Sequence, residues 1–307
     1  MGTDGLYIGI SGWRYVPWRG EFYPKGLPQR EELRYAAHAF ASIELNGSFY
    51  GLQTPGRYRQ WKAQTPAGFR FSVKGPRFVT HLRRLREPQQ GLANFFASGP
   101  LELDDKLGAF LWQLPPSLAY DGELLEAFLA LLPRDSHAAA ELAGSADARL
   151  RHDAPSPSRR FALRHALEVR HKSFCSAEFT DQLRRHGVAL VMADAPSKWP
   201  YAEDLTAPDF TYLRLHGAEQ LYASGYGEAA LRRWSERIRL WRNGLQPADA
   251  ELIDADKRGD RRHRELYCYF DNDIKVRAPF DAFRLMQLLD VRLPQQQVPG
   301  EPAEDWT

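Results

Sequence analysis

Polar side chains that could do chemistry alternate with apolar ones in the strand-like segment 210–216, "FTYLRLH". Successive side chains of a strand point to opposite faces, so Leu213 and Leu215 share one face. Arg214 and His216 share the other face. An arginine fork grips carboxylate or phosphate, and histidine exchanges protons near neutral pH. This face therefore predicts a polar pocket that binds an anion and transfers protons.

The same alternation in other strand-like segments yields a set of polar residues opposite the apolar face. The candidates for proton transfer are Glu44, Glu168, Asp194 and His216. The candidates for substrate binding are Trp13, Asn46, Tyr50, Lys74, Gln113, Arg170, Arg214 and Asn272. The facing of the last strand-like segment is ambiguous, so Tyr269 and Asp271 are further candidates there.

Two other interpretations of these charges stay open. The charges could form an ion-pair network that plugs the fold, although burying them is costly and apolar filling is often as stable. Alternatively, the four proton-transfer candidates are ligand types that suit Mg²⁺ or Mn²⁺. Lys74, Arg170 and Arg214 lie at a similar depth and disfavour a bound cation. No metal site is therefore assigned.

Two loops next to these candidates could extend a ligand site. The segment 74–86, "KGPRFVTHLRRLR", is strongly basic, which suits an anion but is equally typical of a solvated helix face. The segment 12–23, "GWRYVPWRGEFY", is rich in aromatic residues. Aromatic rings with arginines can stack on a base or a sugar, but such rings more often pack a lid.

Elements that could position these residues alternate along the chain. The predicted strands are 7–11, 42–46, 69–74, 107–114, 166–170, 188–194, 210–216 and 266–271. Helical patterns fill most gaps, at 30–40, 56–64, 122–132, 176–187, 228–244 and 280–289. Eight strand–helix pairs in 307 residues predict an α/β fold of the (β/α)₈ TIM-barrel type, with an open doubly wound sheet as the alternative. In such a barrel the charged candidates would line the C-terminal mouth.

Composition narrows the class of protein. The chain is 43% hydrophobic and 26% charged, as expected of a soluble globular protein. Its net charge of +2 gives no support to nucleic acid as a partner, although a nucleic-acid-derived ligand stays open. Two distant cysteines make a disulfide framework improbable. The absence of a signal-peptide pattern and of a long apolar run predicts a cytoplasmic protein without a membrane partner.

Segments that break the alternation set the predicted domain organisation. One TIM-barrel domain is expected over 1–294, with inserted polar loops at about 136–160 and 249–265. The first insertion is rich in Ala, Ser, Pro and charge and is expected to be partly disordered. Residues 295–307 are expected to form a flexible C-terminal tail.

Several stretches, in order along the chain, resemble the YecE-like family, whose activity is not settled. They are "GISGWRYVPWRGEFYPKGLP", "ASIELNGSFYGLQTP", "TPAGFRFSVKGPRFVTH", "LWQLPPSL", "LEVRHKSF", "YLRLHG" and "YCYFDND". The resemblance covers roughly residues 7–289 and implies a TIM barrel, but it implies no reaction. The first insertion is longer than expected of the family, and Asp271 stands where the family more usually has Asn.

The predicted function is an enzyme that acts on a phosphorylated or other anionic small molecule at the mouth of the barrel. A hydrolase, a lyase and an isomerase all stay open, and the sequence assigns no cofactor. The alternative is a non-catalytic barrel protein that binds a ligand in the same pocket.

Overall fold

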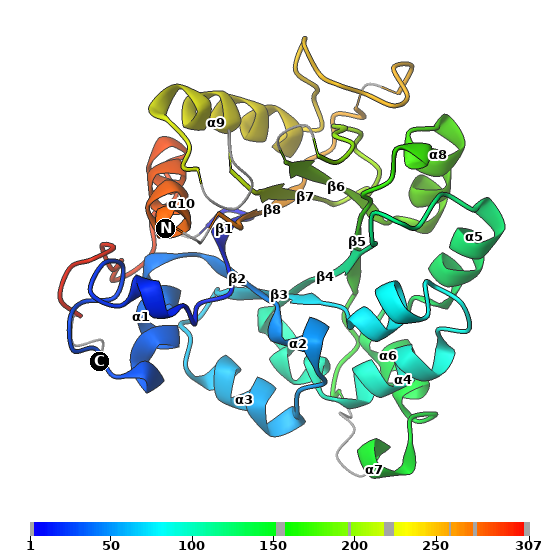
Figure 1. The fold of residues 1–307 in the computed structure, drawn as a ribbon, viewed down its shortest axis with the longest axis horizontal. Coiled ribbons are helices and arrows are strands. Elements are labelled where there is room, and N and C mark those ends of the chain that lie inside the picture. Colours follow the sequence, from blue (N-terminus) through cyan, green and yellow to red (C-terminus); the bar gives the residue numbers. More distant parts are fainter. Residues whose placement is uncertain are drawn as a thin grey trace.

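The computed structural model describes residues 3–151, 157–195, 198–217, 224–257, 259–272 and 275–303. In this part of the chain, eight parallel strands close into a barrel in sequence order. Figure 1 shows the helices outside the strands. Because β8 pairs with β1, the sheet has no open edge and the doubly wound alternative is wrong. The predicted (β/α)₈ TIM barrel, in a single domain, is confirmed.

The strands are short and largely buried. They are β1 (Leu6–Ser11), β2 (Ser42–Leu45), β3 (Arg70–Lys74), β4 (Leu107–Gln113), β5 (Arg164–Glu168), β6 (Ala189–Asp194), β7 (Phe210–Leu215) and β8 (Glu265–Phe270). Parallel register places Arg214 of β7 level with Ala193 of β6 and Tyr269 of β8. The inner-face positions thus line up in layers, as they do in barrels of this type.

Helices cover the barrel between most strands. The α-helices are α1 (Glu32–Ala39), α2 (Gly47–Tyr50), α3 (Pro55–Ala63), α4 (Gln89–Ala97), α5 (Gly122–Leu131), α6 (Ser136–Ala143), α7 (Ala148–Arg151), α8 (Ala177–His186), α9 (Glu228–Arg242) and α10 (Arg277–Leu288). Shorter helical turns are η1 (Val16–Trp18), η2 (Gln29–Glu31), η3 (Phe78–Leu82), η4 (Pro100–Lys106) and η5 (Lys172–Phe174). Between β6 and β7, residues 195 and 198–209 form no helix.

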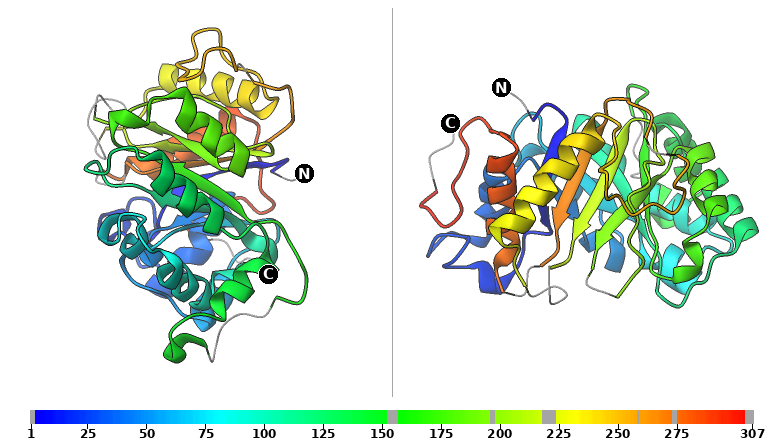
Figure 2. Two further views of the ribbon diagram at one scale, coloured as in Figure 1. Left: turned by 90° about the vertical axis from the view of Figure 1, so that its right-hand side faces the viewer. Right: turned by 90° about the horizontal axis from the view of Figure 1, so that it is seen from above.

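Local sequence explains where the main helices begin and end. The side chains of Asp121 and Ser176 accept hydrogen bonds from backbone N–H groups in the first turns of α5 and α8. Helix α8 ends at Gly187, whose φ of 60° suits a residue without a Cβ. Figure 2 shows α9 and α10 side by side on one flank of the barrel. These helices bury the apolar outer faces of the strands.

The base of the barrel, at the N-terminal ends of the strands, is filled by tyrosine rings and small side chains. Tyr7 and Tyr267 stack with ring centroids 4.9 Å apart. They belong to an apolar cluster with Ala109, Leu111, Ala166, Ala189, Val191, Ala193, Ala207, Phe210, Tyr212 and Tyr269. A Cβ on Gly108 would meet the Tyr267 ring at 2.8 Å, so the missing side chain makes room for that ring. Large rings on one side of the barrel thus match alanines on the other.

Two segments differ from the sequence prediction. Residues 136–143, expected within a partly disordered insertion, form α6 against α4, with Ala139 and Ala143 buried. Asp135 starts this helix by accepting hydrogen bonds from the backbone of its first turn. Residues 152–156 of the insertion lie outside the described residues. Residues 249–257 and 259–264 of the second predicted insertion form no helix or strand.

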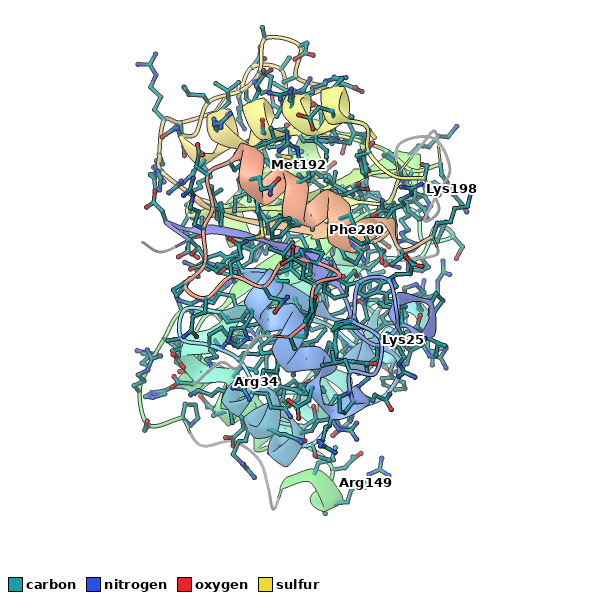
Figure 3. The ribbon with its side chains drawn as sticks, turned by 90° about the vertical axis from the view of Figure 1, so that its left-hand side faces the viewer. Lys25, Arg34, Arg149, Met192, Lys198 and Phe280 are labelled. Atoms are coloured by element: carbon teal, nitrogen blue, oxygen red, sulfur yellow. The ribbon has the colours of Figure 1, made fainter. Side chains whose placement is uncertain are left out.

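The C-terminal segment was expected to be flexible, yet its described part packs against the domain. Gln297 is buried, and the Tyr35 hydroxyl of α1 donates to the carbonyl oxygens of Val298 and Glu301. Figure 3 shows this segment lying over α1, where Arg34 is labelled, with Phe280 on the outer face of α10. Buried polar contacts of this kind tie residues 297–301 to the barrel. Residues 304–307 lie outside the described residues.

Candidate active site

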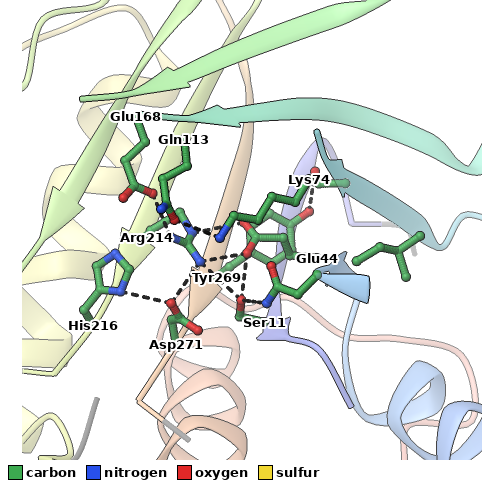
Figure 4. Close-up of polar contacts among 12 residues, drawn as sticks. Ser11, Glu44, Lys74, Gln113, Glu168, Arg214, His216, Tyr269 and Asp271 are labelled. Atoms are coloured by element: carbon green, nitrogen blue, oxygen red, sulfur yellow. Dashed lines mark hydrogen bonds and ion pairs between the residues drawn. The ribbon is translucent and has the colours of Figure 1, made fainter. Parts of the chain in front are cut away.

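Charged side chains of the barrel interior gather at the C-terminal ends of the strands. They and their polar neighbours are Ser11 (β1), Glu44 (β2), Lys74 (β3), Gln113 (β4), Glu168 (β5), Arg214 (β7) and Asp271, which follows β8. Figure 4 shows these side chains converging on Arg214. TIM-barrel enzymes build their active sites at this end. The predicted inward orientation of the charged candidates on β2, β3, β5 and β7 therefore matches a shared mouth.

One arginine holds three carboxylates together. The Nε and Nη2 atoms of Arg214 lie 3.1 and 2.9 Å from the two carboxylate oxygens of Glu44. Its Nη1 lies 2.6 Å from Glu168, and its Nη2 lies 2.9 Å from Asp271. Ser11 donates to Glu44 at 2.7 Å. We call these five residues the Arg214 network. Because Arg214 is only 1% exposed, its guanidinium group is committed to the protein's own carboxylates.

Nearby positive charges keep Glu168 and Asp271 ionised. Burial disfavours the carboxylates of Glu168 and Asp271, but nearby positive groups outweigh burial and hold both pKa values well below their usual range. For Glu168 those groups are Arg170 and Arg214. For Asp271, Arg214 acts first and His216 second. Glu168 is therefore a poor proton donor at neutral pH.

Lys74 lies in the same mouth and has no ion pair with any of the described residues. Its Nζ donates to Oε1 of Gln113 at 2.8 Å and lies 4.3 Å from the centroid of the Phe49 ring. The side chain is 8% exposed. Burial, reinforced by Arg214, lowers the pKa of Lys74 to about 8. A fraction of this amine is consequently neutral at physiological pH.

Arg170 is the most accessible cation of the interior. Its Nε donates to Glu168 at 2.7 Å, and its guanidinium carbon lies 3.6 Å from the centroid of the Trp199 ring. The side chain is 10% exposed, and within the described residues its terminal Nη atoms make no hydrogen bond. Stacking on Trp199 holds the guanidinium plane while its outer edge stays available.

His81, from η3, faces the same two cations. Burial lowers its pKa to about 4, and the positive charges of Lys74 and Arg170 contribute to this shift. His81 is therefore a neutral hydrogen-bonding group at neutral pH. Of the basic segment 74–86, Lys74 and His81 lie at the mouth, whereas Arg83 and Arg84 bond Glu87 and Ser117 instead.

His216 lies on the opposite side of the network from Lys74, as Figure 4 shows. Its Nδ1 is 3.1 Å from Oδ2 of Asp271, and its ring makes an edge contact with Trp199. A carboxylate beside one ring nitrogen orients a histidine for proton transfer through the other. The predicted pairing of His216 with an acid is therefore present, but the acid is Asp271 rather than Glu44 or Glu168.

Asp194 and Asn272 belong to a separate group, which we call the outer cluster. The Tyr226 hydroxyl donates to Asp194 at 2.7 Å, and Asn272 donates to Asp281 of α10 at 2.9 Å. The Tyr226 backbone N–H also donates to Asp281. Burial raises the pKa of both aspartates. The structure therefore does not bring Asp194 and Asn272 into the Arg214 network.

A cavity of about 440 Å³ opens beside the ends of β1 and β2. Trp13, Asn46 and Tyr50 line it, together with Arg57 and Trp61. The amide nitrogen of Asn46 donates to Ser11 at 2.7 Å, which links the cavity to the Arg214 network. Three of the predicted binding residues thus meet in one cavity next to the charged mouth.

The whole chain matches a known family. The model of the family described as "Protein of unknown function DUF72" covers residues 7–305. The chain belongs to the DUF72 family. It is 30% identical to the UPF0759 protein YunF of Bacillus subtilis, over 93% of this chain and 95% of that protein. It is 32% identical to the UPF0759 protein YecE of Escherichia coli over a shorter stretch, 36% of this chain and 38% of that protein.

A solved DUF72 structure supports the same architecture. The crystal structure of a DUF72 family protein from Thermotoga maritima superposes with a TM-score of 0.66. The two chains are 26% identical, and the match covers 93% of this chain and 99% of the other. The resemblance to the YecE-like family is thereby confirmed, since YecE is among the relatives. Membership of the family supports the barrel fold. The reaction has to be inferred from the side chains of the site.

Among the described residues, no group of three or more His, Cys, Asp or Glu side chains is arranged to hold a metal ion. The carboxylates of Glu44 and Glu168 point at Arg214 instead. No helix within the described ranges is both long and apolar enough to cross a membrane.

Sequence reasoning missed several residues of this DUF72 site. Ser11 and Tyr212 both donate to Glu44, and Trp199 stacks on Arg170. Strand alternation could have found Tyr212, because it shares a face with Arg214. Trp199 lies in the connection between β6 and β7, where no periodic pattern gives a signal.

Proposed function

We propose that this protein is a TIM-barrel enzyme that binds a phosphorylated or other anionic small molecule at the mouth of the barrel. One observation carries the proposal. Within the described residues, Lys74 has no ion pair and the Nη atoms of Arg170 make no hydrogen bond, whereas Glu44, Glu168 and Asp271 are all paired with Arg214. An arginine edge and an amine on one side of a cleft suit a phosphate or carboxylate group.

The proposal moves anion binding away from Arg214, which the sequence favoured. Arg214 already bonds Glu44, Glu168 and Asp271, so an incoming anion would have to displace a buried carboxylate. Its proposed role is to hold those carboxylates in place. Arg170 replaces it as the main anion-binding residue because its outer edge reaches solvent.

Proton transfer is assigned to His216, oriented by Asp271. Glu44 and Glu168 are proposed to act through their charges, since both accept hydrogen bonds from Arg214. Asp194 stays a second candidate acid, because its raised pKa favours the protonated form that a general acid needs. The cavity of Trp13, Asn46 and Tyr50 would hold the remainder of the substrate.

A non-catalytic binding protein is the second candidate. The observation that favours it is the Arg214 network itself, because three carboxylates around one buried arginine also describe a structural plug. Turnover in a screen of phosphorylated and carboxylated compounds would favour the enzyme. Stabilisation by such compounds without turnover would favour the binding protein.

The first prediction tests anion binding with thermal unfolding in rising phosphate concentration. Phosphate should raise the melting temperature of the wild type, because a ligand of the folded state stabilises it. Arg170→Met should lose most of that gain. Arg164→Met is the matched control, since Arg164 lies at the base, at the start of the strand that Arg170 follows, and pairs with Asp209 and Glu265. Equal phosphate gains in both variants would contradict the proposal.

A further inference from the structure

Two lysines are buried to the same extent at opposite ends of the barrel, and their partners differ. Lys74 at the mouth and Lys106 at the base are each 8% exposed. The Nζ of Lys106 donates to the carbonyl oxygens of Lys62 and Thr65 and to the Thr65 hydroxyl. Three acceptors match the three protons of an ammonium group. Lys106 is therefore held as a cation by the backbone.

Lys74 lacks such a cage. Among the described residues, its Nζ donates one hydrogen bond, to Gln113. The carboxylates nearest to it are bonded to Arg214, and the Phe49 ring covers another side. A neutral amine keeps two N–H groups, so Lys74 can lose a proton and still donate to Gln113.

We propose that Lys74 is a nucleophile that forms an imine with the carbonyl carbon of an anionic aldehyde or ketone. The inference rests on the proposed function, because Arg170 is required to hold the anionic group of the same molecule. Lys74 bonds Gln113 of β4, Gln113 is level with Glu168 of β5, and Arg170 bonds Glu168, so these two cations lie around one side of the mouth. A molecule with its carbonyl and its phosphate a few bonds apart would span them.

The surroundings of Lys74 favour the neutral amine that such a step needs. Burial lowers the pKa of Lys74 to about 8, and Arg214 lowers it further in the same direction. The negative charges of Glu44, Glu168 and Asp271 oppose this lowering of the Lys74 pKa, but all three carboxylates are paired with Arg214. Desolvation next to another cation is a recognised way to activate a lysine toward carbonyl substrates.

The proposed step balances as follows. The lone pair on Nζ forms a bond to the carbonyl carbon, and one amine proton passes to the carbonyl oxygen to give a carbinolamine. The carbinolamine then takes up one proton from solvent at the mouth and loses water, which leaves a protonated imine on Lys74. No oxidant, reductant or metal takes part. The protonated imine is an electron sink for breaking a bond next to the former carbonyl carbon.

The experiment traps the imine with sodium borohydride, which reduces it to a stable secondary amine. The full-length protein is incubated with glycolaldehyde phosphate or, in parallel, with uncharged glycolaldehyde. Peptide mass spectrometry then compares Lys74, Lys106 and the exposed Lys25, which Figure 3 labels. Labelling of Lys74 relative to Lys25 should be about tenfold higher with the phosphate compound. Lys106 should stay unlabelled with both.

Two variants, together with the effect of phosphate on the melting temperature, distinguish the possible explanations of the labelling. Lys74→Arg keeps the charge but forms no imine, so specific labelling should disappear. Arg170→Met should lower labelling by the phosphate compound to the level seen with glycolaldehyde. Equal labelling of Lys74 and Lys25 in the wild type overturns the inference, and needs no variant to fold. If Lys74 is not labelled but phosphate stabilises the wild type and not Arg170→Met, only the imine proposal is overturned. If phosphate stabilises neither, the proposed function fails with it.

Discussion

The base and the mouth are both part of the barrel interior, but apolar side chains fill the base and charged side chains fill the mouth. At the base, tyrosine rings pack against alanines, and burying that apolar area stabilises the fold. At the mouth, Arg214 and three carboxylates replace such packing. Taking each ion out of water costs several kcal/mol, which the ion pairs offset only in part or with excellent geometry. The base is built for stability, whereas the mouth keeps charges that stability alone does not require.

Tyr212 and Tyr269 mark the boundary between the two fillings. Each ring packs in the apolar cluster of the base, but the Tyr212 hydroxyl donates to Glu44 at 2.7 Å. The Tyr269 hydroxyl bonds Ser42 and Ser72 in the same layer. The two rings thus form an apolar layer below the mouth, and the Tyr212 hydroxyl positions Glu44 above that layer.

The largest effect should follow removal of the central charge. Arg214→Met would leave three buried carboxylates without their cation and should lower the free energy of unfolding by about 3–5 kcal/mol. Urea unfolding at pH 7 measures this. Arg264→Met is a useful control, because Arg264 is equally hidden but its partner Asp260 is half-exposed. A loss below about 1 kcal/mol in Arg214→Met would show that the network is no more than a solvated surface cluster.

A smaller effect is expected at the base. Gly108→Ala would place a methyl group 2.8 Å from the Tyr267 ring and should cost about 1–3 kcal/mol through overpacking. Gly51→Ala is the control, since nothing lies within 4 Å of its added Cβ. Equal stability of the two variants, measured by thermal unfolding, would mean that the base is loosely packed and that the contrast with the mouth is weaker than described.

The smallest effect concerns the pH dependence of Lys74. Its pKa is lowered to about 8 in the folded protein, so between pH 8 and 10.5 the unfolded chain binds more protons there. Stability should therefore rise with pH in this window, by about 1 kcal/mol between pH 8 and 9. The measurement is the difference between wild type and Lys74→Met in urea unfolding at the two pH values. If the stability of the wild type relative to Lys74→Met falls with pH, folding raises the pKa of Lys74 instead of lowering it.

Strand alternation was enough to predict much of the mouth from sequence. Glu44, Lys74, Glu168 and Arg214 each lie opposite an apolar face, and that pattern depends only on neighbours along the strand. Which acid meets Arg214 depends instead on strand order and register. That information is not local, so the sequence left Asp271 as a candidate of ambiguous orientation and did not assign Ser11 to the site.

Asp194 and Asn272 show where alternation fails. Strand β6 reads "ALVMAD" and is apolar on both faces, so the sequence carries no signal for which side its last residue takes. In the structure Ala193 is part of the interior cluster, and Asp194 bonds Tyr226 outside it. The sequence prediction of a partly disordered loop over 136–160 did not include the helix at 136–143, for a related reason. A composition rich in alanine is also one that packs a short helix closely against a neighbour, as α6 does against α4.

The sequence separation within the Arg214 network has a consequence for synthesis of the chain. Glu44 precedes Arg214 by 170 residues, and Asp271 follows it by 57. At about 5–20 residues per second, roughly 10–30 s pass on the ribosome between the two residues of the first pair. Until then Glu44 has no guanidinium partner and is better left hydrated than enclosed. The charge of Glu44 therefore opposes early enclosure of β2, and the barrel closes only after Arg214 has been made, when β8 pairs with β1.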